Sequence, residues 1–491
     1  MSMEKPAKES CDLTNIDIIQ GGMGVGVSWH KLAGAVMAEG ALGVVSGTVA
    51  GPVLARRLQD GDPDGYMREA LSSFPDQDIA EQIRTKYYKE NGRAPEQPYK
   101  TVPVFNATSR GLALNLNMVG AFVEVWLAKR IAFQKTNRPG PVGINLLTKL
   151  QEPTLSALYG AMLAGVDCVI MGAGIPHDIP KQIETLALGE RASIQFDVTG
   201  SNQEHRLTFD PSDYPNLQNS GTINIPRFLA VVASNTLVTR LHRNNHPPSG
   251  FVIEGPTAGG HNAPPRDKSG YGNRDIVNLE NITKLDPPLP FWLAGGYGSP
   301  EMLTRAKENG ANGIQVGTAF FASQDSGLDP TLRTKIINEA MRNGVEIKTD
   351  ILASPTGFPF KVAQLAETIS DDQVRENRKR VCDLGFLREA YVNGLSDNGA
   401  ETIGYRCAAE PQEDYVAKGG NIVATIGCAC LCNGLLATIG LGQKRHGSSE
   451  VPIVTAGDNL TETIRRIVGR YSVHFSAKDV ISFLRSDDKQ P

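Results

Sequence analysis

The residues best suited to chemistry lie in one glycine-rich segment, residues 251–261, with the sequence FVIEGPTAGGH. A short apolar run that suits a buried strand is followed by Ala258, Gly259 and Gly260, which leave the backbone bare for a flat or anionic ligand. His261 comes next, and an imidazole can exchange a proton near neutral pH. Such a turn can equally be a tight connection between a strand and a helix. Whether it forms a ligand site therefore depends on the other turns of the chain.

Two further strand ends carry glycine turns, one after the other along the chain. They are Ala294, Gly295 and Gly296, and then Gln315, Val316, Gly317 and Thr318. In parallel barrels the last two strands commonly bind phosphate through backbone N–H groups and a helix N-terminus. Thr318 can add a hydroxyl donor. Close packing would explain either turn alone, whereas two turns on neighbouring late strands favour a phosphate site.

The first predicted strand ends in another glycine turn, QGGMG at residues 20–24. Its spacing does not match the dinucleotide-binding fingerprint, and no acidic residue ends the next strand. The backbone amides of Gly22, Met23 and Gly24 can instead bond the edge of a ring system, with the Met23 side chain packed on the ring. Asn145, at the end of another strand, can serve the same ring or cap a helix.

The elements that must position these turns alternate between short apolar strands and amphipathic helices. Helices are predicted at about residues 28–39, 154–163 and 300–309. Eight strands are predicted, at residues 16–20, 42–46, 142–146, 168–171, 228–233, 251–254, 291–294 and 313–316. Regular alternation implies a parallel sheet with helices outside it, and eight strands match an α/β fold of the (β/α)8 (TIM) barrel type.

Some segments do not fit this repeat. We expect a barrel domain over residues 1–360 with two insertions: a helical region at about 50–138 and a β-hairpin at about 190–225. A C-terminal subdomain that is helical, at least to about residue 400, and rich in cysteine is expected over residues 361–491.

Composition excludes several classes of function. The chain has 491 residues, of which 40% are hydrophobic and 21% charged, and its net charge is −4. This charge gives no attraction to nucleic acid or to an anionic membrane. No uncharged apolar run approaches the ~18 residues of a membrane helix, and the N-terminus lacks an apolar secretion signal. Seven cysteines, an odd number, fit reduced thiols, so we expect a cytoplasmic protein; a homo-oligomer is compatible with the composition.

The order of the turn motifs resembles the nitronate monooxygenase (2-nitropropane dioxygenase) family from about residue 16 to 361. The FMN-dependent enoyl-acyl-carrier-protein reductases, which share that barrel, carry similar motifs. The motifs are QGGMG, GINLL, MGAGIP, EGPTAGGH, LAGGYG, IQVGT and SPTGFP.

The resemblance implies non-covalently bound FMN and a set of site residues. Gly22, Met23, Gly24 and Asn145 would contact the isoalloxazine ring, and Gly259, Gly260, Ala294, Gly295, Gly296, Gln315, Val316, Gly317 and Thr318 would surround the ribityl phosphate. Glu254 stands where many relatives have glutamine, and His261 matches the catalytic base.

The function implied is the O2-dependent oxidation of alkyl nitronates or nitroalkanes to carbonyl compounds and nitrite. His261 would remove the proton α to the nitro group of a neutral substrate, a task for a base whose pKa lies near the working pH. The alternative is an enoyl-thioester reductase that uses NAD(P)H. A barrel that only binds ligands is disfavoured by the combination of His261 with a full phosphate site. The loop after His261, NAPPR, departs from the family, as do the insertions, so the chain resembles a long-form branch.

Five cysteines lie close together in the C-terminal part. Cys428, Cys430 and Cys432 form a C-x-C-x-C run, with Cys382 and Cys407 upstream. Thiolates can bind zinc or an iron–sulfur cluster. The spacing is not that of a zinc knuckle, and the apolar neighbours favour buried structural thiols. We therefore assign no metal ligands from the sequence, and a metal, a cluster and redox chemistry remain as alternatives.

Overall fold

The computed structural model describes residues 12–138, 140–218 and 221–486. Eight parallel strands form its central sheet, in the order β1-β11-β10-β9-β8-β4-β3-β2. The barrel closes where β1 meets β2, because Gln20 N–H donates to Leu42 O and Leu42 N–H donates to Ile18 O, both at 3.0 Å. The strands are β1 (Ile18–Gln20), β2 (Gly43–Ser46), β3 (Val142–Leu147), β4 (Cys168–Gly172), β8 (Arg227–Val232), β9 (Gly250–Glu254), β10 (Phe291–Ala294) and β11 (Gly313–Val316). The predicted TIM barrel is confirmed.

The barrel interior is an apolar core. Alternate residues of each strand point inward, and they meet in one buried cluster that includes Ile19, Val44, Ile170 and Val252. Trp292 fills much of this space and satisfies its ring N–H by donating to the carbonyl of Ile16 at 2.7 Å. The interior is therefore a packed core, and a ligand can bind only at the ends of the strands.

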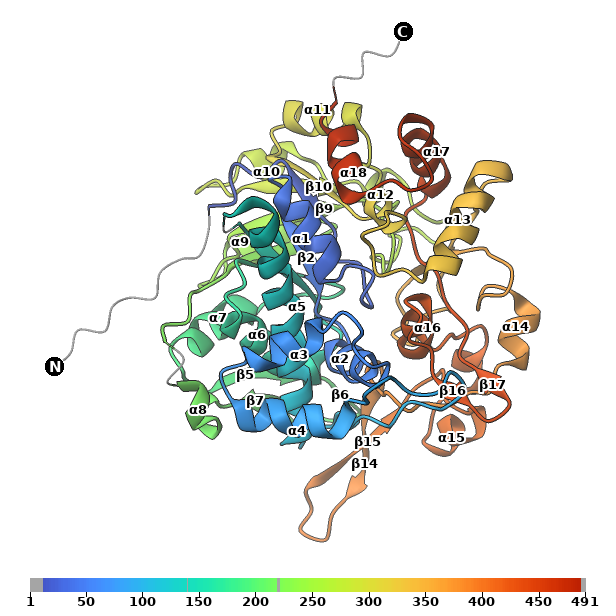
Figure 1. The fold of residues 1–491 in the computed structure, drawn as a ribbon. Coiled ribbons are helices and arrows are strands. Elements are labelled where there is room, and N and C mark those ends of the chain that lie inside the picture. Colours follow the sequence, from blue (N-terminus) through green and yellow to red (C-terminus); the bar gives the residue numbers. More distant parts are fainter. Residues whose placement is uncertain (1–11, 139, 219–220, 487–491) are drawn as a thin grey trace, which may run out of the picture.

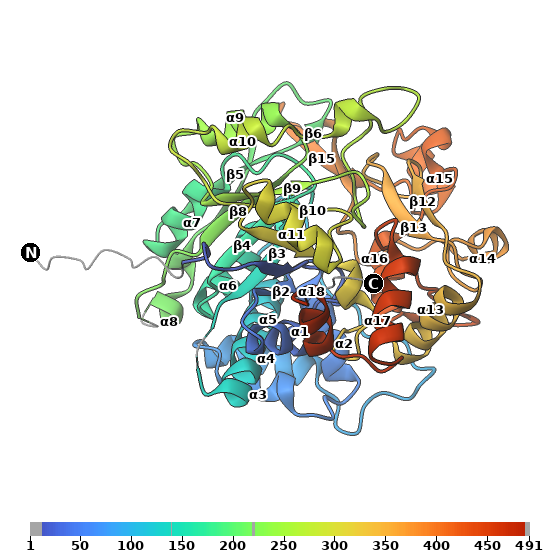
Figure 2. The same ribbon diagram turned by 90° about the horizontal axis from the view of Figure 1, so that it is seen from above.

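Helices surround the barrel (Figures 1 and 2). They are α1 (His30–Ala38), α5 (Leu112–Thr136), α6 (Gln151–Leu163), α7 (Ile179–Ala187), α9 (Asn235–His242), α10 (Glu280–Thr283), α11 (Pro300–Glu308), α12 (Thr318–Phe321) and α13 (Pro330–Arg342). The three helices predicted from sequence correspond to α1, α6 and α11.

Helix α5 belongs to the barrel, although it lies within the segment expected to be an insertion. It packs against α1, α6, β2 and β3, as the barrel's second helix should. Within the segment 50–138, only α2 (Ala50–Gln59), α3 (Tyr66–Ser72) and α4 (Gln77–Tyr87) are additions to the repeat. Within the described part of the chain, α5 is the one helix whose length and composition would suit a membrane, and 78% of its apolar window is buried in the fold. Its Glu124 pairs with His30 Nδ1 at 2.9 Å and with Arg57 Nη1 at 2.7 Å, as expected for a core helix.

The expected hairpin in the second insertion is present as β5 (Ala192–Phe196) and β7 (His205–Phe209), paired antiparallel. Between them, β6 (Val198–Thr199) pairs with strand β14 (Glu389–Leu395) of the C-terminal part. The prediction of helix up to residue 400 is wrong. That stretch contains only one short helix, α14 (Asp372–Asn377), before β14 and β15 (Glu401–Arg406) form a hairpin around the turn residues Asp397, Asn398 and Gly399. This hairpin projects at the bottom of Figure 1.

The rest of the C-terminal part returns to the barrel. Its remaining elements are β12 (Ile347–Asp350), β13 (Phe360–Ala363), α15 (Gln412–Ala417), α16 (Leu431–Thr438), β16 (Lys444–Arg445), β17 (Ser448–Ser449), α17 (Leu460–Arg470) and α18 (Ala477–Leu484). Helix α17 packs on α12 and α13, and α18 packs on α1, α11 and α12 (Figure 1). Because of this packing, the segment between α16 and α17, residues 439–459, lies at the ends of the barrel strands.

Candidate active site

A large cavity opens at the carboxyl ends of the barrel strands, and all the site residues predicted from the sequence line it. They are Gly22, Met23, Gly24, Asn145, Glu254, Gly259, Gly260, His261, Ala294, Gly295, Gly296, Gln315, Val316, Gly317 and Thr318. They come from five strands that are scattered through some 300 residues of sequence. The barrel brings them together because its parallel strands all end on the same face.

The loop after β1 is held in place by hydrogen bonds and by close packing. The Ser28 hydroxyl accepts the N–H of Met23 at 2.8 Å and donates to the carbonyl of Gly21 at 2.9 Å. A Cβ on Gly22 would lie 2.2 Å from Asn145 Cβ. A Cβ on Gly24 would lie 2.6 Å from the Thr48 hydroxyl. Glycine is therefore required here so that the loop can approach β2 and β3, which leaves its backbone along the cavity wall.

The part of the cavity that is expected to bind phosphate has a component that sequence reasoning missed, the segment 455–459. Gly260 N–H donates to Thr455 Oγ1 at 2.8 Å, and Gly457 N–H donates to Thr318 Oγ1 at 3.0 Å. Helix α17 begins directly after Asn459, which also lines the cavity. The Thr318 oxygen accepts a bond from Gly457, so its proton is left to donate to an anion, which a helix N-terminus also favours.

A signal for this segment does exist in the sequence. The run VPIVTAGDN at 451–459 repeats the pattern of the strand ending in TAGGH: an apolar stretch, then Thr-Ala-Gly, then a polar turn. A helical pattern follows it. Residues 451–459 lie about 130 residues beyond the last barrel strand, so the barrel repeat gives no reason to place them at the site.

The cavity contains a buried acceptor that suits a flavin. Gln315 Oε1 is buried and has no hydrogen-bond partner within the protein, and an unpaired buried oxygen is costly. The N–H and hydroxyl groups of a flavin mononucleotide are donors of the kind that this atom lacks. Gly295 and Gly296 have φ values of +83° and +80°, which glycine adopts without strain. The residues present therefore fit the cofactor that the sequence implies.

His261 is fixed from two sides. Its Nε2 lies 2.8 Å from the Ser354 hydroxyl, which also contacts the Thr356 hydroxyl at 2.8 Å. Its ring packs edge-on against Phe360, with the ring centroids 4.8 Å apart. Burial, and to a smaller extent the positive charge of Lys149, lower the pKa of His261 to about 4. The imidazole is thus neutral at pH 7 and a weaker base than we expected from the sequence.

The pKa of Glu254 is shifted in the opposite direction, upward. It ends β9 inside the cavity, and burial raises the pKa of its carboxyl to about 8. The group is therefore protonated at pH 7 and can donate a hydrogen bond, as the amide of glutamine does. A neutral carboxyl can thus take the place of the glutamine that the family resemblance implies at this position.

Part of the cavity lining, here called the apolar end, is apolar, and its residues come mostly from outside the barrel. They comprise Val25, Leu147, Leu150, Phe386, Leu387, Leu431, Leu435 and Ile453, together with the thiol of Cys432. Apart from Val25, Leu147 and Leu150, these residues follow no barrel-strand motif, so the sequence did not reveal this surface. It is the part of the cavity best suited to the hydrocarbon portion of a substrate.

Comparison with known proteins supports the family resemblance. Residues 210–356 match the family model described as nitronate monooxygenase. This range contains His261 and the three late glycine turns, and it identifies the chain as an enzyme of the flavin-dependent oxidoreductase class. No curated protein sequence matched the chain.

Several solved structures are similar to the chain at low sequence identity. FabK from Thermotoga maritima is 15% identical, with 96% of this chain and 91% of that chain covered and a TM-score of 0.44. A nitroalkane oxidase from Streptomyces ansochromogenes is 14% identical, with 96% of each chain covered and a TM-score of 0.44. The enoyl reductase domain of MlnA from Bacillus amyloliquefaciens is 11% identical over 74% of this chain and 86% of that chain, with a TM-score of 0.41.

Proposed function

We propose that this chain is an FMN-dependent enzyme that oxidises alkyl nitronates with O2. Two nitronates and one O2 yield two carbonyl compounds and two nitrite ions, which balances atoms and charge. The observation that carries this proposal is the state of His261: a neutral imidazole, bonded to Ser354 and close to the cation of Lys149. That combination suits an anionic substrate better than a neutral one.

The cofactor would be held by groups already described. The loop at 22–24, Asn145 and the neutral carboxyl of Glu254 would contact the ring system, and Gln315 would accept a hydrogen bond from the cofactor. Thr318, the late glycine turns and the start of α17 would bind the single phosphate. A flavin held there would supply the chemistry of electron transfer from the substrate to O2.

His261 and Lys149 would act on the substrate. Lys149 is exposed, lies between the cavity-lining residues Leu147 and Leu150 in the sequence, and stacks on the Phe358 ring at 4.5 Å. Its charge attracts an anion to the mouth of the cavity. His261 then orients the nitro oxygens or, with a neutral nitroalkane, takes the α proton less effectively because its pKa is low.

The test is an anaerobic mixing experiment with the flavin-loaded protein. Propyl-2-nitronate should change the flavin spectrum, NADPH should leave it unchanged, and admitting air should restore it with release of nitrite. His261→Asn should retain flavin while slowing the reaction. A flavin spectrum that the nitronate does not change would refute the proposal.

The attraction of the anion is tested separately. Lys149→Gln should raise KM for the nitronate about two- to fivefold, the effect of one exposed charge pair, and salt should diminish the difference. Lys284→Gln, at the exposed residue directly after α10, is the matched control and should leave KM unchanged. An unchanged KM in Lys149→Gln would remove the basis for preferring an anionic substrate.

The second candidate is an enoyl-thioester reductase that uses NAD(P)H. The apolar end of the cavity favours it, because Phe386, Leu387, Leu431 and Leu435 offer more hydrocarbon surface than a small nitronate needs. Rapid bleaching of the flavin by NADPH, followed by reoxidation with a medium-chain enoyl thioester, would establish this reaction in place of the first.

A further inference from the structure

One lysine is buried beside the active-site cavity. Among the residues that the structure describes, Lys361 is the one lysine inside the fold, with 3% of its side chain exposed. Its Nζ donates to Asp458 Oδ1 at 2.7 Å and to Asp458 Oδ2 at 2.8 Å. Burying an ammonium group is costly even when the group is paired. The fold therefore holds this charge in place at a cost, and its position calls for an explanation.

Lys361 lies on β13, a strand that supports part of the cavity wall. Its backbone N–H donates to the carbonyl of Gly260 at 2.9 Å. The preceding residue, Phe360, forms an isolated antiparallel bridge with His261 and packs its ring against the imidazole. The backbone of β13 thus holds the glycine turn and the histidine, while the Lys361 side chain extends to the segment 455–459.

The turn that contains Asp458 presents its backbone to the cavity. Gly457 and Asn459 line the cavity, whereas Asp458, between them, is not part of the lining. The N–H of Asp458 donates to the carbonyl of Thr257 at 3.1 Å, and its carboxylate is paired with Lys361. The turn is therefore fixed by a backbone hydrogen bond and by an ion pair that lies outside the cavity lining.

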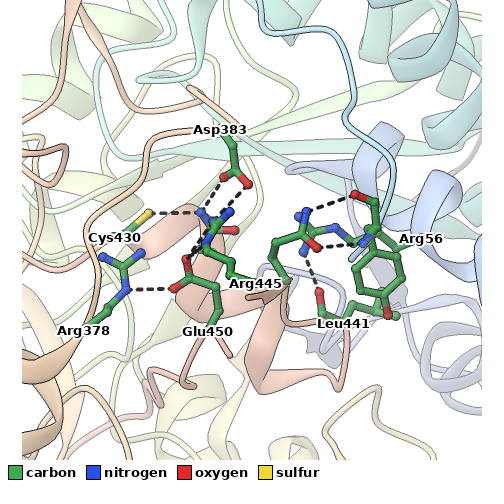
Figure 3. A network of polar contacts seen from close by, with 10 residues as sticks. Arg56, Arg378, Asp383, Cys430, Leu441, Arg445 and Glu450 are labelled. Atoms are coloured by element: carbon green, nitrogen blue, oxygen red, sulfur yellow. Dashed lines mark hydrogen bonds and ion pairs between the residues drawn. The ribbon is translucent and has the colours of Figure 1, made fainter. Parts of the chain in front are cut away.

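Another group of buried ion pairs in the C-terminal part does not reach the active-site cavity (Figure 3). Arg378 Nε donates to Glu450 Oε2 at 2.8 Å, and Arg445 Nη2 donates to Glu450 at 2.9 Å and to Asp383 at 3.0 Å. None of these four residues lines the cavity. They join segments of the C-terminal part to one another, whereas the pair of Lys361 and Asp458 joins two segments that bound the cavity.

The charge of Lys361 matters for an anion at this end of the cavity. A phosphate bound beside Gly457 and Asn459 would be repelled by an uncompensated carboxylate at position 458. Lys361 cancels that charge and fixes the direction of the Asp458 side chain. The isoalloxazine ring system is uncharged and would be held by the loop at 22–24, so neither effect should change its binding.

We propose that Lys361 is a positioning residue for the phosphate of FMN. It acts through Asp458 and makes the site prefer FMN to riboflavin, which has the same ring system without the phosphate. The inference rests on the FMN cofactor of the proposed function and does not depend on the nitronate substrate.

The experiment compares two flavins on the flavin-free full chain. Quenching of flavin fluorescence gives one Kd for FMN and one for riboflavin. In Lys361→Met the Kd for FMN should rise about tenfold or more, the effect of one hydrogen-bonded charge, while the Kd for riboflavin should stay within about twofold. A residue that only stabilised the fold would raise both Kd values equally, so the ratio of the two separates the roles.

Two further variants test the route through Asp458. The double variant Lys361→Met, Asp458→Asn should recover most of the lost affinity for FMN, because the uncompensated carboxylate is gone. Arg378→Met breaks a buried ion pair of the group in Figure 3 and is the matched control, so the ratio of its two Kd values should equal that of the wild type. Circular dichroism establishes that each variant is folded, and Lys361→Gln is measured if Lys361→Met is not.

Several results would overturn the proposal. They are equal weakening of both flavins in Lys361→Met, no recovery in the double variant, the same change of ratio in Arg378→Met, and wild-type protein that binds FMN no more tightly than riboflavin. Failure of both Lys361→Met and Lys361→Gln to fold would assign the ion pair to stability and overturn it too. Tight FMN binding without any reaction with propyl-2-nitronate would refute the proposed function alone.

Discussion

Replacing Glu254 with glutamine tests the electrostatics of the active-site cavity directly. The pKa of this carboxyl is raised from 4.5 to about 8 by burial, so at pH 7 it is protonated in the folded protein and ionised in the unfolded chain. One pKa unit corresponds to about 1.4 kcal/mol, so the folded state is disfavoured by about 3 kcal/mol at pH 7. Glutamine keeps the shape and the hydrogen-bonding capacity of the neutral acid without titrating.

The sign of the pH dependence follows from the direction of the shift. Below pH 4.5 both states bind the proton, and Glu254 costs no stability. As the pH rises from 4.5 to about 8, the unfolded chain releases its proton first and the folded state loses stability. The free energy of unfolding of E254Q should therefore exceed that of the wild type by about 1.4 kcal/mol for each pH unit across this window.

Urea unfolding of the flavin-free protein between about pH 5.5 and pH 8 measures this difference. Tryptophan fluorescence suits the purpose because Trp29, Trp126 and Trp292 all lie in the barrel part of the chain. Glu308→Gln, on an exposed position of α11, is the control. A difference between E254Q and wild type that stays constant with pH would show that Glu254 is ionised in the folded protein, which would refute the reasoning.

Three further substitutions test other parts of the site. Gly259→Ala should weaken flavin binding at least tenfold, because its Cβ would lie 2.7 Å from the backbone of the 455–459 segment; equilibrium dialysis of flavin measures this. Ser354→Ala removes the hydrogen bond to His261 Nε2, about 1 kcal/mol, so kcat with a nitronate should fall roughly fivefold at unchanged flavin content in stopped-flow assays. Leu435→Trp should fill the apolar end, so steady-state KM should rise for long-chain nitronates and not for propyl-2-nitronate.

Matched controls keep these results interpretable. Gly272→Ala introduces a Cβ with no heavy atom within 4 Å, so it should bind flavin as the wild type does. Leu395→Trp places the same bulky ring on an exposed hairpin position and should leave all KM values unchanged. If either control behaves like its partner, the effect comes from general destabilisation and not from the cavity.

Much of the barrel could be predicted because its signals are local. A run such as FVIE at 251–254 is apolar, short and followed by glycine, and such a pattern is typical of a buried parallel strand. Once eight such runs are recognised, the barrel places every strand end on one face. Gly22, Asn145, Gly295 and Thr318 could therefore be assigned to one site without any knowledge of their contacts.

The C-terminal part was harder because its structure depends on distant partners. The charged stretch before residue 400 suggested helix, yet Tyr391 and its neighbours pair with β15 and with β6, some 190 residues away. Likewise, the turn pattern around Gly457 does not identify Thr318, 139 residues earlier in the chain, as the acceptor of its N–H. Local propensity is a weak guide where pairing between remote segments decides the conformation.

The sequence by itself determined the barrel, the turn motifs at its strand ends and the residue types available for chemistry, since these depend on local patterns of apolar and glycine residues. Only the tertiary structure decided the charge states of His261 and Glu254, since desolvation exists only once other segments bury the group. It also decided which surfaces close the active site. Those features arise from contacts between segments whose separation in the sequence gives no sign that they will meet.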